Sequence, residues 1–472
     1  MSHRHPVFSR TAISLLATAL LSPLAQAQST GGEADRVSEL EQRLLVLERQ
    51  LEIQTEEAAN KAKDAPVVTA GERGFSLKSA KGDSEIRFTA LGQVDHRAFL
   101  DDDGAFRDSF ITRRLRPTLQ GSVGKLVGFR FTPEFAGAAG LGEGSTTLGI
   151  VDAYFDLRFH PAASVRAGKQ KGLLGLERLQ SGGAISFVER GYATELLPNR
   201  DLGVAVFGEL AQGTVNYSAG VFDGTADGRD VIGAGGAGSD DGLKDYQARV
   251  FFEPFKNDYG PFKGLGFGLA GSSGAFDGTG NNFIARYRTP GQNVFFTFNE
   301  TGVAASGQHI RYSPQATYYF NNLGVLAEYA VSEQDLSRAG VERSVKTTAY
   351  NVTTSYVLTG EDASFRGVRP GKPYSIGGDG WGALEVVARV GELRLNNEAF
   401  AGTAANRFAN ASTQAEKAQS YGIGLNWYLT QNAKFTTDFN FTEFNGGGGG
   451  TVAAPVDRRD EKALFTRLTI QY

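Results

Sequence analysis

Residues 464–472 read LFTRLTIQY, and the sequence stops there on an aromatic residue. Leu464, Leu468 and Ile470 alternate with Arg467 and Thr469, which is the period-two pattern of a strand with one apolar and one polar face. The machinery that assembles outer-membrane barrels in Gram-negative bacteria reads a terminal strand of this kind. The stretch therefore predicts the closing strand of a transmembrane β-barrel, with the barrel-assembly machinery as a partner during biogenesis.

The same alternation runs through most of the chain from residue 84 onward. Val151 and Phe155 share one face of a predicted strand, and Asp152 falls on the other; residues 421–427 repeat the pattern. One face suits lipid, whereas the other is polar, charged or small. A barrel whose polar face lines a water-filled interior needs this arrangement.

Connection lengths give an independent indication, because long and short connections alternate along most of the chain. Long outer loops and short periplasmic turns are typical of a transmembrane barrel. We therefore predict an all-β fold, a 16-stranded antiparallel transmembrane β-barrel, preceded by a short helical coiled-coil segment. The predicted strands are 84–99, 109–121, 124–137, 147–159, 163–170, 202–211, 214–222, 244–253, 264–273, 307–319, 322–333, 344–358, 381–396, 416–429, 432–444 and 461–472. Three segments fit less well: 74–81 and 280–300 are ambiguous, and 359–380 is too long for a periplasmic turn.

Composition supports this class and excludes others. The 472 residues include 61 Gly, 33 Phe and 16 Tyr but no Cys, so disulfide scaffolds and thiolate metal sites are excluded. Aromatic girdles and a low mean hydropathy of −0.25 fit a barrel better than a helical membrane protein. The formal net charge is −4, and loss of two leader arginines would make it −6, so bulk attraction to nucleic acid is not expected.

The N-terminal region divides into three expected segments before the barrel. Residues 1–27 have a basic start, an apolar run too short to span a membrane and a small-residue cleavage site, which together predict a signal peptide. Residues 33–57 place apolar side chains at heptad positions, which favours a periplasmic coiled coil over a helix lying on the barrel. Residues 58–73 are expected to be a linker, and residues 74–472 the barrel. The heptad residues are Val37, Leu40, Leu44, Leu47 and Leu51.

The expected solute-binding groups are cations that would face the lumen. Guanidinium groups bind oxyanions with paired hydrogen bonds, and a series of them lets an anion exchange water stepwise. Segment 171–201 is long and apolar enough to fold inward as a constriction loop, and it also carries charges of both signs. Pairing with lumen carboxylates is an equally weighted alternative for any single arginine. The candidate pore and anion-binding residues are Arg114, Arg116, Arg130, Arg166, Lys169, Lys171, Arg178, Arg190, Arg200, Arg286 and Arg288.

Catalytic and metal-binding patterns are weak. His96, His160 and His309 lack metal-ligand spacing, and no nucleophile-elbow or phosphate-loop motif occurs, so we expect no cofactor and no metal. The acidic loop 223–241 could bind Ca²⁺, although a solvated loop is the more common outcome.

Several stretches, in order along the chain, are similar to one known family. These stretches are GFSLKSA at 74–80, RRLR at 113–116, GKQK at 168–171, FVER at 187–190, RDLG at 200–203 and LTGED at 358–362. The sequence in this respect resembles the phosphate-selective porin O and P family. The resemblance implies homotrimers of sixteen-stranded barrels in the outer membrane, in contact with lipid and lipopolysaccharide, that pass inorganic anions such as phosphate or polyphosphate. It also implies an inward-folded periplasmic turn at 359–380, which would bring Arg366, Arg369 and Lys372 toward the pore.

Four hypotheses remain after the sequence has been considered. The first is a passive porin that favours phosphate or related oxyanions. The second is a general or organic-solute diffusion porin without a phosphate site. The third is an outer-membrane barrel enzyme, and the fourth is a structural or adhesive barrel whose coiled coil contacts peptidoglycan.

Overall fold

A computed structural model describes residues 32–71, 74–100, 108–136, 149–231, 241–299 and 301–472. The expected signal peptide lies outside these residues. The chain forms two units, residues 1–65 and residues 66–472.

The described part of the first unit is one helix, α1 (Gly32–Asp64). The helix passes the expected boundary at residue 57, and Val67–Gly71 then forms a strand, so regular structure occupies much of the segment 58–73 that we expected to be a linker. The Glu-, Ala- and Lys-rich sequence after residue 57 consists of good helix formers, which explains the extension. No helix within the described residues is long and apolar enough to cross a membrane. The five heptad side chains, Val37, Leu40, Leu44, Leu47 and Leu51, are 53–67% exposed.

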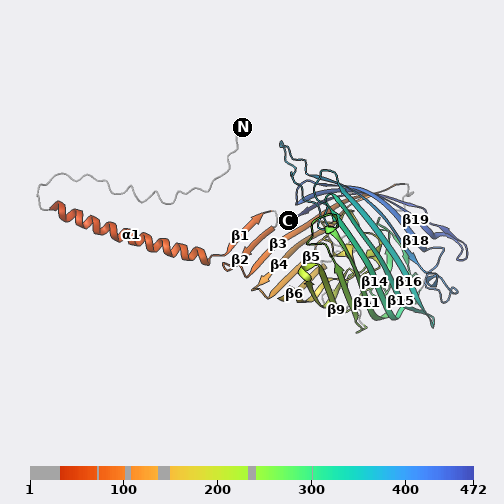
Figure 1. The fold of residues 1–472 in the computed structure, drawn as a ribbon. Coiled ribbons are helices and arrows are strands. Elements are labelled where there is room, and N and C mark those ends of the chain that lie inside the picture. The colour runs from red at the N-terminus through yellow and green to blue at the C-terminus, as the bar shows by residue number, and fades with distance from the viewer. Residues whose placement is uncertain (1–31, 72–73, 101–107, 137–148, 232–240, 300) are drawn as a thin grey trace. The chain divides into compact units, whose positions relative to one another are not determined.

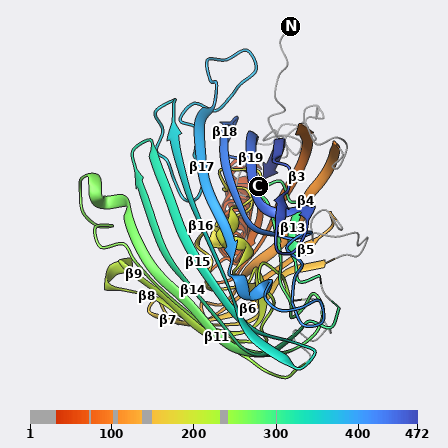
Figure 2. The ribbon, with the colours of Figure 1, turned by 90° about the vertical axis from the view of Figure 1, so that its right-hand side faces the viewer.

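The second unit is a closed antiparallel β-barrel of sixteen strands, as predicted. Each strand pairs with the next, and the last strand pairs with the first through Leu468↔Val94 and neighbouring residues. Figure 2 shows β14 to β19 side by side along one wall. The wall strands are β3 (Glu85–Leu100), β4 (Ser109–Val123), β5 (Val127–Glu134), β6 (Gly149–His160), β7 (Ala163–Lys171), β8 (Arg200–Leu210), β9 (Val215–Phe222), β10 (Asp245–Phe252), β11 (Leu265–Gly278), β14 (Ala304–Phe320), β15 (Leu323–Arg338), β16 (Val341–Val357), β17 (Ala383–Leu395), β18 (Ala415–Tyr428), β19 (Ala433–Gly450) and β21 (Glu461–Gln471).

The period of two in the sequence corresponds to the two faces of the wall. On β21, Leu464, Leu468 and Ile470 are exposed, whereas Arg467 and Thr469 are buried. Exposed apolar side chains on the outside of a barrel are those that lipid covers, and the buried polar ones face the interior. The alternation predicted this division correctly.

Five short strands lie outside the wall. The ambiguous segment 74–81 contains β2 (Gly74–Lys78), which pairs with β1 (Val67–Gly71) and with the start of β3 (Figure 1). The segment 280–300 carries a hairpin of β12 (Arg286–Arg288) and β13 (Val294–Thr297) within the fifth long loop. β20 (Pro455–Asp457) pairs with the end of β19.

Two segments are tied to residues inside the barrel and define its constricted region. The first is the inward loop, residues 172–199 between β7 and β8, which contains α3 (Leu176–Leu179) and η1 (Tyr192–Glu195). Most of its side chains are buried. The second is the inward turn, residues 358–382 between β16 and β17, on the side of the barrel that carries the short turns. We assign this side to the periplasm.

Candidate functional site

Side chains of the barrel wall hold the backbone of the inward loop in place. The carboxylate of Glu328 on β15 accepts hydrogen bonds from the N–H groups of Leu176 and Glu177, at 2.6 and 3.2 Å. Asp438 on β19 accepts one from Val188 N–H at 2.6 Å. Buried N–H groups need acceptors, and carboxylates provide strong ones. These wall carboxylates therefore bind the loop and do not line an open pore.

Two glycines allow the loop to approach the wall closely. A Cβ atom on Gly191 would overlap the side-chain amide of Asn351 on β16, and one on Gly183 would overlap that of Gln471 on β21. Only glycine fits at these contacts without movement of the wall. The glycines therefore help to fix the path of the loop across the lumen.

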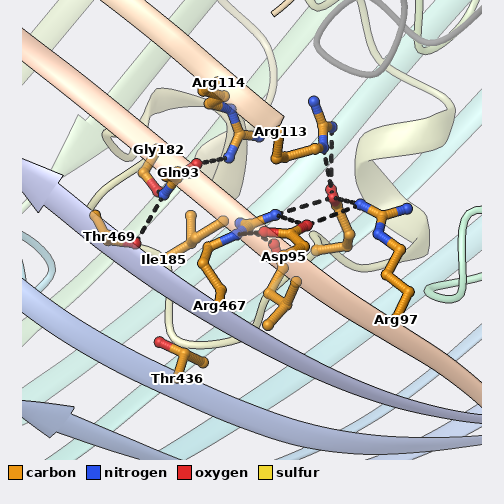
Figure 3. A network of polar contacts seen from close by, with 12 residues as sticks. Gln93, Asp95, Arg97, Arg113, Arg114, Gly182, Ile185, Thr436, Arg467 and Thr469 are labelled. Carbon is orange, nitrogen blue, oxygen red and sulfur yellow. Dashed lines mark hydrogen bonds and ion pairs between the residues drawn. The ribbon is translucent and has the colours of Figure 1, made fainter. Parts of the chain in front are cut away.

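Glu189 connects the same loop to the seam where the barrel closes. Its carboxylate accepts hydrogen bonds from Arg97 at 2.7 Å, Arg113 at 2.6 Å and Arg467 at 3.2 Å. Figure 3 shows the three guanidinium groups close together beside Asp95. Burial by itself would raise the pKa of Glu189, but the three positive charges outweigh it and hold the pKa well below its usual range. The carboxylate is therefore ionised and fully engaged.

The inward turn packs against the inward loop. Phe365 contacts the buried cluster that includes Leu176, and its carbonyl accepts a hydrogen bond from Gln180 Nε2 at 3.0 Å. Val368 is buried in a second cluster with Tyr428 of β18. The long connection that did not fit a simple periplasmic turn is thus a structural part of the lumen.

A cavity of about 720 Å³ lies between the inward loop and the periplasmic turns. We call it the vestibule. Its lining includes Leu173, Leu179 and 181–183 from the inward loop, and 430–433 from a short periplasmic turn. Of the residues that the structure describes, eight with cationic side chains line it, but only one with a carboxylate side chain does, Asp152. The cations are Arg116, Arg130, Arg166, Lys171, Arg200, Arg366, Arg369 and Lys434.

Four of these cations form ion pairs with wall carboxylates. Arg130 and Arg200 share Asp152, at 3.3 and 3.0 Å. Arg116 pairs with Glu134 at 2.5 Å.

Arg166 binds Asp156 through two hydrogen bonds of 2.7 and 3.1 Å and lies 4.0 Å from the centre of the Tyr154 ring. Structural pairing, the alternative that the sequence left open, therefore applies to the wall arginines Arg116, Arg130, Arg166 and Arg200.

The other four cations have no ion pair with a described residue. Lys171 donates to the carbonyls of Leu179 and Gln180, both at 2.9 Å, and Lys434 donates to that of Ile185 at 2.8 Å. Arg366 and Arg369 are exposed on the inward turn. The positive excess of the vestibule is therefore carried mainly by Lys171, Lys434, Arg366 and Arg369.

Six of the eleven candidate residues do not line the vestibule, and four of them bind backbone or polar groups within the fold. Arg114 is buried and donates to the side chain of Gln93. Lys169 donates to Val231 O at 2.8 Å, and Arg178 to Thr194 O at 3.2 Å. Arg190 donates to the carbonyls of Glu177 and Gln180, each at 3.0 Å. These contacts hold the inward loop and its neighbours together.

The remaining two, Arg286 and Arg288, lie on β12 in the fifth long loop. The backbone N–H of Arg288 donates to Glu195 of the inward loop at 3.2 Å. Burial, and then the charge of Arg288, lower the pKa of Arg286 to about 10. The two arginines therefore belong to a separate group, on the side of the barrel with the long loops.

Sequence reasoning missed Lys434, and it placed Arg366 and Arg369 near the pore only through the family resemblance. Lys434 directly follows a tight turn. In the sequence, the one indication that its side chain faces the lumen is its alternation with the apolar Phe435. Lys372, the third basic residue of the turn, is exposed and does not line the vestibule.

The acidic loop considered for Ca²⁺ uses several carboxylates in other contacts. Asp227 pairs with Arg311 at 2.7 Å, and Asp223 pairs with Lys244 at 3.2 Å. No group of three potential ligands with metal-binding geometry occurs in the described part of the chain. Asp240 lies outside that part.

A closed sixteen-stranded barrel with an inward loop and a charged vestibule defines a diffusion channel of the outer membrane. The chain belongs to the phosphate-selective porin O and P family, whose pattern matches residues 92–443. Membership and fold together favour a channel over an enzyme. No curated protein matches the sequence significantly.

Solved structures with the same fold are outer-membrane proteins of other bacteria. The outer membrane channel DcaP of Acinetobacter baumannii aligns over 85% of this chain and 100% of its own, with a TM-score of 0.52 and 12% identity. OmpT, an outer membrane protein of Vibrio cholerae, aligns over 83% of this chain and 98% of its own, with a TM-score of 0.50 and 11% identity. At this level of identity the likeness concerns the fold alone.

Proposed function

We propose that the protein is a passive channel that prefers anions such as phosphate or polyphosphate. The observation that supports this preference is the lining of the vestibule, where the described residues place eight cationic side chains and one carboxylate side chain. Such an excess lowers the energy of an anion in a narrow aqueous passage and raises that of a cation. The overall charge of −4 does not oppose this preference, because the local groups along the path act at much shorter range.

The placement of the acidic residues supports the same proposal. Glu328 and Asp438 of the wall bind N–H groups of the inward loop, and Glu189 of that loop binds arginines of the wall, so the charges of all three carboxylates are engaged. Guanidinium and ammonium groups remain along the lining, and both bind oxyanions through charge-assisted hydrogen bonds.

A general diffusion porin without a phosphate site is the second candidate. The ion pairs of Arg116, Arg130, Arg166 and Arg200 favour it, because paired arginines have less capacity to bind a passing anion. Single-channel recording in planar bilayers separates the two candidates. A binding channel shows a conductance that saturates with chloride concentration and is blocked by phosphate. A conductance that rises linearly with salt, without phosphate block, would favour the general porin.

We further propose that the chain is exported by a cleaved signal peptide at 1–27 and functions as a homotrimer in contact with lipid and lipopolysaccharide. The exposed heptad side chains of α1 support a self-associating coiled coil over residues 33–57, because two heptads cannot bury their apolar seam without a partner. Exposed apolar side chains on the barrel wall, such as Leu468 and Ile470, support the contact with lipid.

A further inference from the structure

The unpaired cations of the vestibule come from two structurally separate sources. Lys171 and Lys434 belong to wall strands β7 and β19, whereas Arg366 and Arg369 belong to the inward turn. All four line the same cavity of about 720 Å³. Cavities of roughly 300–1,000 Å³ are typical of sites for small organic ligands, so the vestibule has room for more than one inorganic ion.

The two lysines are fixed by the inward loop. Lys171 donates to the carbonyls of Leu179 and Gln180, and Lys434 donates to that of Ile185, so the two ammonium groups bind the loop before and after 181–183. An ammonium group has three donors. Lys171 uses two of them and Lys434 one in these bonds. Each lysine therefore keeps a donor for a solute in the vestibule.

The two arginines are fixed by the turn that carries them. Phe365 and Val368 pack into the hydrophobic clusters, while Arg366 and Arg369 next to them are exposed. Gly367 has a φ of 90°, a backbone conformation that other residues rarely adopt. Neither arginine has a carboxylate partner among the described residues. The turn thus presents two guanidinium groups from an anchored backbone.

We propose that the vestibule is a binding site for anions with two charged groups, held between the lysine pair and the arginine pair. This inference rests on the proposed anion preference and assigns a solute class to it. An anion with one charged group engages fewer of these four cations than a dianion such as a short dicarboxylate. The paired arginines Arg116, Arg130, Arg166 and Arg200 line other parts of the same cavity.

The test compares block by glutarate, which has two carboxylates, with block by butyrate, which has one, in single-channel recordings of the full chain. In the native channel, glutarate is expected to block at much lower concentration than butyrate. The double variant R366Q/R369Q should weaken glutarate block by about tenfold per guanidinium removed, because a hydrogen bond to a charged group contributes about that much. Butyrate block should change much less.

The matched control is K372Q, which removes one positive charge from the same turn at an exposed position that does not line the vestibule. Its glutarate block should equal that of the native channel. The proposal is overturned if glutarate blocks R366Q/R369Q as strongly as it blocks the native channel. It is also overturned if K372Q weakens glutarate block as much as R366Q/R369Q does.

Different results would contradict the dianion site and the proposed anion preference of the channel. A native channel that prefers cations contradicts the proposed function. A native channel that prefers anions, but in which glutarate blocks no better than butyrate, contradicts only the dianion site.

Discussion

Arg467 on β21 and Asp95 on β3 form a two-bond ion pair across the seam where the barrel closes. The Nε–Oδ1 distance is 2.6 Å and the Nη2–Oδ2 distance is 2.7 Å, and both side chains are at most 2% exposed. Arg467 also donates to Val188 O and to Glu189 of the inward loop. One arginine thus connects the first strand, the last strand and the constriction.

Replacing Asp95 by Asn should destabilise the barrel strongly. The variant removes the two-bond carboxylate partner of Arg467, which keeps its longer contact with Glu189, and breaking a buried ion pair costs up to about 3–5 kcal/mol. We therefore expect D95N to lower the temperature at which the folded barrel loses its characteristic gel mobility. Glu253 provides a control, because its pair with Lys256 is partly exposed and E253Q should cost about 1 kcal/mol or less. Equal unfolding temperatures for D95N and E253Q would show that the seam pair is unimportant.

Replacing Glu189 by Gln should loosen the inward loop, because three guanidinium groups then lose their shared carboxylate. We expect noisier single-channel current and a lower unfolding temperature than in the native protein. The folded-state pKa of Glu189 is lowered, so its contribution to stability is present above about pH 4.5, the usual value, and is lost as the pH falls further. The difference in unfolding temperature between native protein and E189Q should therefore shrink in acid. A difference that grows in acid would contradict this role.

The heptad seam of α1 should contribute to the stability of the proposed trimer. The triple variant L40N/L44N/L47N places polar groups in the seam and should lower the temperature at which trimers dissociate, while monomeric barrels stay folded. Leu45 and Val46 are equally exposed but lie off the seam, so L45N/V46N is a matched control with little expected effect. If both variants form trimers that dissociate at the same temperature as native trimers, the helix has no role in assembly.

The barrel could be predicted from the sequence because its rules are local. The alternation on β21 or β6 assigns each side chain to the lipid or to the lumen. The length of each connection between strands assigns it to the outer or to the periplasmic side of the barrel. The inward loop was predicted for a similar reason, since its length and apolar character are visible in one stretch.

The cations that line the vestibule could be predicted only in part, because pairing across strands is not local. Parity shows that Arg130 faces inward, but it does not show that Arg130 shares Asp152, on the neighbouring strand β6, with Arg200 on β8. Arg190 carries the same charge as Arg116, yet it folds back onto carbonyls of its own loop. Lys434 is held in the vestibule by a hydrogen bond to the carbonyl of Ile185 in the inward loop, which is 249 residues away in the sequence.

The central claim is that the vestibule makes this channel prefer anions. The most direct test is the reversal potential of the native channel in a planar bilayer with a KCl gradient. We expect a sign that corresponds to chloride passing more readily than potassium, and a shift of the reversal potential toward zero in R366Q/R369Q. A reversal potential of the opposite sign, showing preference for potassium, would contradict it.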